Sequence, residues 1–401
     1  MELLDAPLFQ TLNTLPAFPF ARMVRPDRLG MRDAQSAFFS NRTLPTFTYS
    51  LADRFDAMGY LRTLNAVADR IETLPALDTI RSLYREKIEE LRTRCALIQA
   101  IQQKDDVAVS SIADHLFGTS TMTAASLQGE FDHILGRVHE LHTHEDRIDA
   151  TLFTIMVRAM LEHYGMHEWT IRETSRLSVS VVRGDRNATP TVKIPKTFLA
   201  SRARAARLLT HEIEVHALRS HNGRTSPLLL LGHGLARYIT TDEGLAMSLQ
   251  QSLRPETSTE PGFWDAWAAA LTVNHGFMDA FDTLASARAT LNAALGRKDA
   301  ITQANMTAWR LMVRVSRGLH SPGPVGLGYR RDHIYRSGLI DIRQTLNTYG
   351  KTEILPTLFA GHAGTQHIPA LKTLGITGRT PDMIGTQVVK DVRDAQRKTR
   401  A

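Results

Sequence analysis

The stretch His211-Glu212-Ile213-Glu214-Val215-His216 places two histidines five residues apart, with a glutamate directly after the first. A second acidic motif follows it, Thr241-Asp242-Glu243-Gly244-Leu245-Ala246. Two imidazoles, one carboxylate ligand and one carboxylate base are the groups that a water-activating metal site needs. The two motifs together therefore predict a metallohydrolase, and a peptidase before other kinds.

The five-residue spacing of the histidines has a structural consequence. A regular α-helix turns about 100° per residue, so His211 and His216 would lie about 140° apart and could not share one ion. A π-bulge would bring both rings to one side, and such bulges occur mostly at functional sites. The metal interpretation therefore predicts a distortion in the helix expected over 203–220. In the alternative, Glu212 and His216 form an ordinary i, i+4 ion pair.

Glu243 has two competing interpretations. It can be the third metal ligand, or it can be the N3 residue of a capping box in which Thr240 is the N-cap of a short helix near Thr241. One carboxylate cannot fill both roles. Asn222-Gly223 is expected to end the motif helix as a C-cap would.

The rest of the chain favours a mainly helical α+β fold. Residues 1–50 show no clear periodicity, and helical periodicity is expected over about 51–67, 80–101, 123–141 and 145–163. Residues 177–182 and 189–194 predict two strands with a turn at 184–187, and Pro190 places the second strand at an edge or a strand start. After Phe263 the chain is again mostly helical.

We therefore predict three consecutive regions. Residues 1–170 form a helical N-terminal region, 171–260 a core with a small sheet before the motif helix, and 261–401 a helical C-terminal region that completes the active-site cleft. No internal repeat or low-complexity segment contradicts this division.

The composition is that of an ordinary globular protein. Apolar residues make up 43% and charged residues 22% of the 401, which excludes disorder and coiled coil. No apolar run approaches the roughly 18 residues that span a bilayer, and the N-terminus lacks the pattern of a signal peptide. The single cysteine, Cys95, fits a reducing compartment and leaves only histidines and carboxylates as metal ligands. We expect a cytoplasmic protein without a membrane partner.

The net charge of +7 is dispersed along the chain. A basic surface suits acidic partners, such as an acidic peptide. The clearest basic cluster, at 390–400, contains both signs and has the character of a solvated terminus, so no nucleic-acid partner is expected. The oligomeric state does not follow from the sequence.

Taken together, the motifs resemble those of a known family. His-Glu-x-x-x-His, Asn-Gly and Thr-x-Glu-Gly-Leu-Ala, followed by Arg331-Asp332-His333-Ile334-Tyr335 before Gly338, are similar to the tyrosine carboxypeptidase family. This family includes the microtubule-associated tyrosine carboxypeptidase and the bacterial "QEGLA motif" proteins. The resemblance spans about residues 40–375. Asp242 stands where the family usually has Gln or Glu, and Ser226-Pro227 also departs from its pattern, which leaves the substrate preference open.

The resemblance implies a metal centre and its ligands. His211, His216 and Glu243 would bind zinc, and Glu212 would be the general base that takes a proton from the activated water. The fold would have a zinc-peptidase-like core with a small sheet before the active-site helix.

The resemblance also implies groups that would contact the substrate. Tyr335 could hydrogen-bond the tetrahedral oxyanion, and Arg330 or Arg331 could pair with a C-terminal carboxylate. The alternative for Tyr335 is helix packing against a neighbouring leucine. The predicted edge strand at 191–194, which carries Lys193, could bind an extended peptide by strand addition.

The implied activity is zinc-dependent removal of a C-terminal residue, an aromatic one such as Tyr or Phe, from a peptide or protein. One alternative is an endopeptidase or aminopeptidase with the same site, and Asp332 beside Arg331 leaves that choice undecided. The other is a non-enzymatic regulator or scaffold, against which Glu212 argues because a structural zinc site needs no free base.

Overall fold

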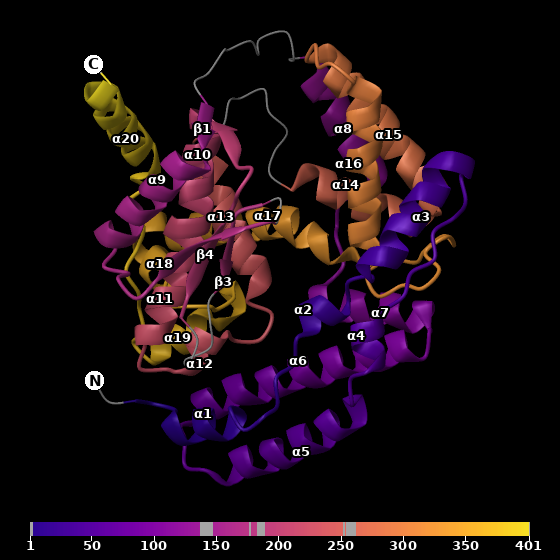
Figure 1. Cartoon of the computed structure of the whole chain (residues 1–401). Coiled ribbons are helices and arrows are strands. Elements are labelled where there is room, and N and C mark those ends of the chain that lie inside the picture. Colours follow the sequence, from indigo (N-terminus) through magenta and orange to yellow (C-terminus); the bar gives the residue numbers. More distant parts are fainter. Residues whose placement is uncertain are drawn as a thin grey trace. The chain divides into compact units, whose positions relative to one another are not determined.

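The computed structural model describes residues 3–136, 147–175, 178–182, 189–251, 253 and 262–400. The chain forms two compact units from interleaved stretches (Figure 1). Unit 1 contains residues 1–9, 142–258 and 338–401, and unit 2 contains residues 10–141 and 259–337. These two units do not coincide with the three predicted regions. The division of the chain into three regions stays a prediction.

Unit 1 carries two small sheets. In the larger one, β4 (Thr191–Pro195) lies between β2 (Thr170–Thr174), which is parallel to it, and β3 (Ser180–Val182), which is antiparallel. The smaller sheet pairs β1 (Arg147–Asp149) with β5 (Leu199–Ser201). The predicted strand at 189–194 is thus present, but its predicted edge position is wrong because both sides of β4 are paired. Pro190 directly precedes β4, and the turn predicted at 184–187 lies outside the described residues.

Helices cover this sheet and form the rest of unit 1. Before the motif come α9 (Ala150–His163) and α10 (Arg202–Leu209), capped by the side chains of Asp149 and Ser201. After the motif come α11 (Leu218–Thr225), α12 (Leu230–His233) and α13 (Ile239–Gln251). The chain returns in α17 (Ile334–Tyr349), α18 (Lys351–Leu358), the 3-10 turn η4 (Thr365–His367), α19 (Ile368–Thr373) and α20 (Gly385–Arg400).

The hydrophobic core of unit 1 lies under the sheet. Val192 of β4 pairs with Ile171 and Val181, and these side chains pack against a cluster that includes Ile213 and Leu245. Because side chains alternate along a strand, the neighbouring Lys193 points to the opposite face. The apolar positions of the motif helix thus fix its place on the sheet.

Among its described residues, unit 2 contains helices and no strand. Its elements are α1 (Ala6–Leu12, which begins in unit 1), α2 (Phe20–Met23), α3 (Arg28–Asn41), α4 (Ser50–Asp53), α5 (Ala57–Thr73), α6 (Asp78–Gln102), α7 (Asp106–Phe117), α8 (Ala124–Leu135), α14 (Phe263–Asn274), α15 (Phe277–Ala294), α16 (Ala300–Val315) and the 3-10 turn η3 (Arg330–His333). Three helices form within residues 1–50, although that stretch shows no clear periodicity in the sequence. The aromatic rings of Phe38, Phe277 and Trp309 pack together and hold α3 against α15 and α16.

The predicted mainly helical α+β fold is confirmed. Two helix boundaries differ from expectation. The helix expected at 145–163 begins at Ala150, after β1, and that expected at 123–141 ends at Leu135 within the described residues. Across the described parts of the chain, none of the helices combines the length and apolarity needed to cross a membrane, and a cytoplasmic location stays a prediction.

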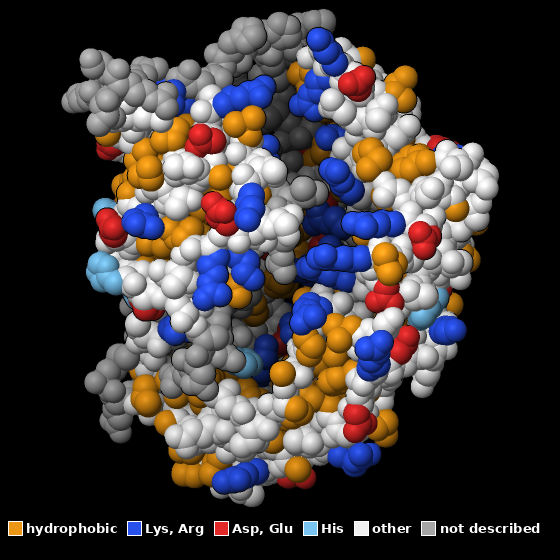
Figure 2. Space-filling model, viewed as in Figure 1, with side chains coloured by type: hydrophobic (Ala, Val, Ile, Leu, Met, Phe, Trp, Pro, Cys, Tyr) orange, Lys and Arg blue, Asp and Glu red, His pale blue; other side chains and the backbone are white. Residues whose placement is uncertain are grey.

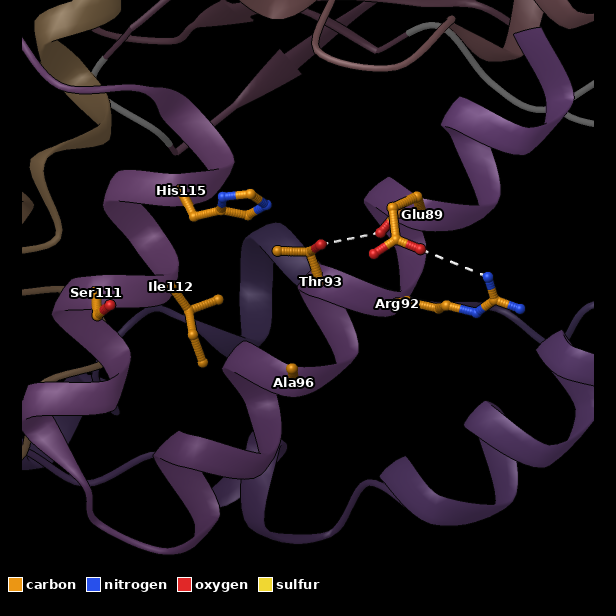
Figure 3. A pocket seen from close by; sticks show the side chains of 7 residues that line it. All are labelled: Glu89, Arg92, Thr93, Ala96, Ser111, Ile112 and His115. Atoms are coloured by element: carbon orange, nitrogen blue, oxygen red, sulfur yellow. Dashed lines mark hydrogen bonds and ion pairs between the residues drawn. The ribbon is translucent and has the colours of Figure 1, made fainter. Parts of the chain in front are cut away.

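One surface groove lies between α6 and α7 of unit 2 (Figure 3). Polar side chains that include Glu89, Thr93, Ser111 and His115 line it. None of the residues singled out by the sequence lines this groove. The candidate site residues therefore lie elsewhere in the chain.

Candidate metal centre

The helix that carries both histidines is locally distorted, as their spacing predicts. Residues Thr210–Ala217 form a π-helix, η2, which is continuous with α10 before it and α11 after it. The wider turn brings the rings of His211 and His216 to 4.7 Å between centroids. The motif helix continues to Thr225, so the predicted C-cap at Asn222-Gly223 is wrong.

Three ligand atoms converge at this helix. The Nε2 atoms of His211 and His216 lie 3.1 Å apart, and Oε2 of Glu243 lies 3.8 Å from the first and 3.6 Å from the second. The three side chains are each 13–14% exposed. Among the described residues they form the one group of His, Cys, Asp or Glu side chains with the spacing of a metal site.

The donor set fits a zinc ion. Bonds of about 2.0–2.2 Å in a tetrahedral site place neighbouring donor atoms about 3.3–3.6 Å apart, close to the distances between these three atoms. Two imidazoles and one carboxylate leave a fourth position for water or substrate, as catalytic zinc sites do. The capping box proposed as the alternative role of Glu243 does not form, because α13 begins at Ile239 and Thr240 is therefore not its N-cap.

Helix α13 supplies more than the third ligand. Asp242 accepts a hydrogen bond from Nδ1 of His216 at 2.9 Å, and the side chain of Gln250 hydrogen-bonds His211. A carboxylate on Nδ1 fixes the imidazole tautomer and leaves Nε2 for the metal. Sequence reasoning assigned no role to either residue, although Asp directly before a ligand Glu could have suggested one.

The electrostatics of the two histidines differ. Burial, together with the neighbouring His216, lowers the pKa of His211 to about 4, so its ring is neutral at pH 7. Burial would also lower the pKa of His216, but Asp242 and Glu243 outweigh it and raise that pKa well above its usual value. A metal must therefore displace a proton from His216.

Glu212 lies beside the three ligand atoms without being one of them. Burial, together with the negative charges of Glu243 and Asp242, raises the pKa of its carboxyl to about 7. The charge of His216 and a hydrogen bond from the backbone amide of Val181 act in the other direction. A carboxyl group with a pKa near neutrality can both accept and donate a proton at pH 7.

Gly244, directly after Glu243, allows another helix to approach. A Cβ atom at Gly244 would lie 2.3 Å from the carbonyl oxygen of Gly338 in α17, and one at Gly338 would lie 2.2 Å from the carbonyl oxygen of Thr240. Only glycine permits backbones to come this close. The glycines of the two motifs thus meet in unit 1 and fix α13, which carries the metal ligand, against α17.

The remaining predicted residues lie on other elements. Lys193 is in the centre of β4, paired with Arg172 of β2 and Ser180 of β3. Arg330 and Arg331 are in η3, and Tyr335 is in the first turn of α17, all three within unit 2. Their part in a shared site with the metal ligands stays a prediction.

Each of these three side chains of unit 2 has local partners. Arg330 forms an ion pair with Asp114 at 2.7 Å and donates to the carbonyl of Gly326. Arg331 lies 3.4 Å from the carboxylate of Asp332. The guanidinium of Arg314 lies over the ring of Tyr335, 5.7 Å from its centroid.

The comparison with known families agrees with the motifs. A profile of the microtubule-associated tyrosine carboxypeptidase family matches residues 36–251, which include η2, α13 and all three ligand residues. No curated protein matches the chain. The matched stretch covers more than half of the 401 residues. The family resemblance read from the motifs is therefore confirmed, and this chain belongs to the microtubule-associated tyrosine carboxypeptidase family.

Proposed function

We propose that the protein is a zinc-dependent carboxypeptidase that removes a C-terminal residue, Tyr or Phe, from a peptide or protein. The observation that carries the proposal is the convergence of His211, His216 and Glu243 around one point, with Glu212 beside it. A purely structural metal site has no use for such a base. Family membership supports a tyrosine carboxypeptidase activity in general terms.

His211, His216 and Glu243 would hold the zinc. When bound, zinc supplies a Lewis acid that polarises the scissile carbonyl and lowers the pKa of a bound water. Glu212 would accept the proton of the attacking water as a general base and pass it to the leaving amine as a general acid.

A peptide substrate would lie along β3. This strand is the edge of the three-stranded sheet on the side of Glu212, and β4 pairs with its other side. The three-stranded sheet pairs β3 with β4 on one side only, so an extended peptide could add along the other side of β3 as a further strand. Lys193, on the middle strand β4, would offer the peptide only its positive charge, on the face of the sheet to which its side chain points.

Recognition of the C-terminal carboxylate is assigned to η3. Arg330 and Arg331 are the proposed partners, because a guanidinium binds a carboxylate in a bidentate manner. Tyr335 is the proposed donor to the oxyanion.

The surroundings of Asp332 favour a carboxypeptidase over an aminopeptidase. Asp332 is 1% exposed, and its carboxylate contacts Arg314, Arg317 and Arg331. It is therefore a buried counterion and not an acidic group that could bind a substrate amine. Figure 2 shows basic side chains gathered over the region of α14 and α16 in unit 2, which suits an acidic substrate.

The test is release of free amino acid from matched peptides. The zinc-loaded protein is incubated with an acidic peptide that ends in Tyr, the same peptide ending in Phe or Ala, and the Tyr peptide with an amidated C-terminus. We expect release of Tyr and Phe, little Ala, and none from the amide, because it lacks the charge that an arginine would bind. Internal cleavage, or release of the N-terminal residue, would refute the carboxypeptidase assignment.

A further inference from the structure

A buried arginine connects the metal centre to the C-terminal part of unit 1. Arg219, in α11, is fully buried. Its Nε donates to the carbonyl of Leu358 at 3.0 Å, and its Nη2 donates to the carbonyl of Ala363 at 2.6 Å. Both carbonyls belong to the turn at 358–363 between α18 and η4, which lies outside the stretch 36–251 matched by the family.

The turn at 358–363 is itself firmly held. The backbone of His362 donates to the carbonyl of Leu231 at 3.1 Å and accepts from the amide of Leu235 at 2.9 Å. Gly361 has a φ of +149°, and a Cβ atom there would lie 2.9 Å from the Cα of Gly223. The two carbonyls that receive Arg219 therefore have fixed positions.

The third contact of Arg219 leads to the metal ligands. Its Nη1 donates to Oδ1 of Asp242, which is 4% exposed, while Oδ2 of the same carboxylate accepts from Nδ1 of His216. A buried carboxylate and guanidinium stabilise a structure only when their geometry is well satisfied. Oδ1 of Asp242 thus takes Arg219, with Nδ1 of His362 from the same turn 3.4 Å away, and Oδ2 takes His216. Arg219 makes the shorter contact to Oδ1, so its position helps to set the direction in which Asp242 holds the imidazole.

We propose that Arg219 is a positioning residue of the metal centre. Anchored on the turn at 358–363, it holds Asp242, and Asp242 holds His216 with Nε2 toward the metal. The C-terminal turn is then a working part of the centre, although no ligand comes from it. This inference rests on the proposed zinc site, and it adds a residue that contacts neither metal nor substrate.

The test compares two variants that lose contacts to the same turn. Arg219→Gln removes the anchor and the contact to Asp242. Asn222→Ala is the matched control, because Asn222 also donates to backbone carbonyls of this part of the chain, those of Phe359 and Arg379, but does not touch Asp242. The zinc dissociation constant of each folded variant is measured by competition with a chelator, alongside its unfolding midpoint.

We expect Arg219→Gln to weaken zinc binding about 10- to 100-fold, as loss of an outer-shell partner does. Asn222→Ala lowers the unfolding midpoint but leaves the zinc dissociation constant unchanged. Arg219→Lys, which keeps the charge but not all three contacts, gives a smaller loss and serves if the Gln variant does not fold.

A double-variant cycle separates positioning from general destabilisation. In an Asp242→Asn background, Arg219→Gln should weaken zinc binding much less than in the wild type, because both changes act through the same imidazole. Equal zinc affinity in the Arg219 and Asn222 variants, or full additivity with Asp242→Asn, would overturn the inference. A wild-type protein that binds no zinc would instead overturn the proposed function on which the inference rests.

Discussion

Each of the two units contains a buried aspartate, but only one of the two lies beside the candidate metal centre. Asp242 in unit 1 is 4% exposed and Asp332 in unit 2 is 1% exposed, and each contacts arginine. Burial would raise the pKa of both, but positive neighbours hold both well below the usual range.

The difference lies in what surrounds each carboxylate. Three guanidinium groups, those of Arg314, Arg317 and Arg331, surround Asp332 and supply only hydrogen-bond donors. The carboxylate of Asp242 contacts one arginine, Arg219, and two histidines, His216 and His362. Nε2 of His216 lies with the candidate ligand atoms of His211 and Glu243, so lone pairs converge there. A buried charge alone thus marks an ion cluster, whereas converging lone pairs mark a metal site.

The largest expected effect distinguishes a catalytic glutamate from a structural glutamate in the same helix. Glu212→Gln should lower kcat/KM by about 10²- to 10⁴-fold with zinc retained, because it removes the general base. Glu214→Gln makes the same chemical change two residues away, where the carboxylate accepts from Tyr164, Thr210 and Ile384. It should lower stability and leave most of the turnover. Equal losses of kcat/KM in both variants would erase the distinction.

Removal of either buried aspartate tests the comparison directly. Asp242→Ala should cost about 3–5 kcal/mol of unfolding free energy, because it leaves the buried Arg219 without its counterion. Asp332→Ala should cost less, because its arginine partners are 17–34% exposed and Arg314 keeps its ion pair with Asp265. Chemical denaturation measures that loss. Zinc affinity should fall only in the Asp242 variant. If the folded Asp332 variant also lost zinc, the two centres would not be as distinct as we describe.

The close approach of α13 and α17 at Gly244 and Gly338 should have a smaller effect on stability, and it concerns unit 1. Gly338→Ala should cost about 1–3 kcal/mol, since the new methyl group overlaps the backbone of α13. Gly129→Ala is the control in unit 2, where α8 is exposed and a Cβ meets nothing within 4 Å. That variant should gain about 0.5–1 kcal/mol from helix propensity. A neutral Gly338→Ala variant would show that α13 and α17 can separate.

Proton linkage should differ between the two centres in the metal-free protein. The pKa values of Asp242 and Asp332 are lowered in the folded protein, so both units lose stability as the pH falls below the pKa of an ordinary aspartate. The raised pKa of His216 adds stability that is present below about 6.5 and lost as the pH rises through the folded value. Unfolding followed against pH should show the second loss in unit 1, and Asp242→Asn should reduce it, because Asp242 and Glu243 together raise the pKa of His216.

The parts of the site that the sequence could predict are those set by local geometry. Two histidines five residues apart around one ion require a wider helical turn, and η2 provides it. Glu243, from the acidic motif on α13, lies within reach of both histidines, and its role as a ligand stays a prediction. The predicted helix over 80–101 also formed, because its apolar periodicity describes a buried face. The stretch 51–67 instead forms parts of two helices, α4 and α5, with residues 54–56 between them.

Long-range pairing could not be predicted. Nothing in the residues 191–194 shows that strands will join both sides of β4, so its edge position was wrong. The partners of Arg219 lie 139 and 144 residues away, at Leu358 and Ala363, and are backbone carbonyls without a sequence signature. Residues 1–50 form helices through tertiary packing, such as that of Phe38 on Trp309, and not through a clear periodicity.

The most direct test of the metal centre is zinc content, measured by elemental analysis on protein purified without a histidine tag. Wild type and His216→Ala are compared, with Asp332→Asn as a variant that alters a buried charge elsewhere. We predict about one zinc per chain in the wild type and in Asp332→Asn, and none in His216→Ala, as expected for a site of three protein ligands. A wild-type protein that holds no zinc, and takes up none when it is added, would contradict the account.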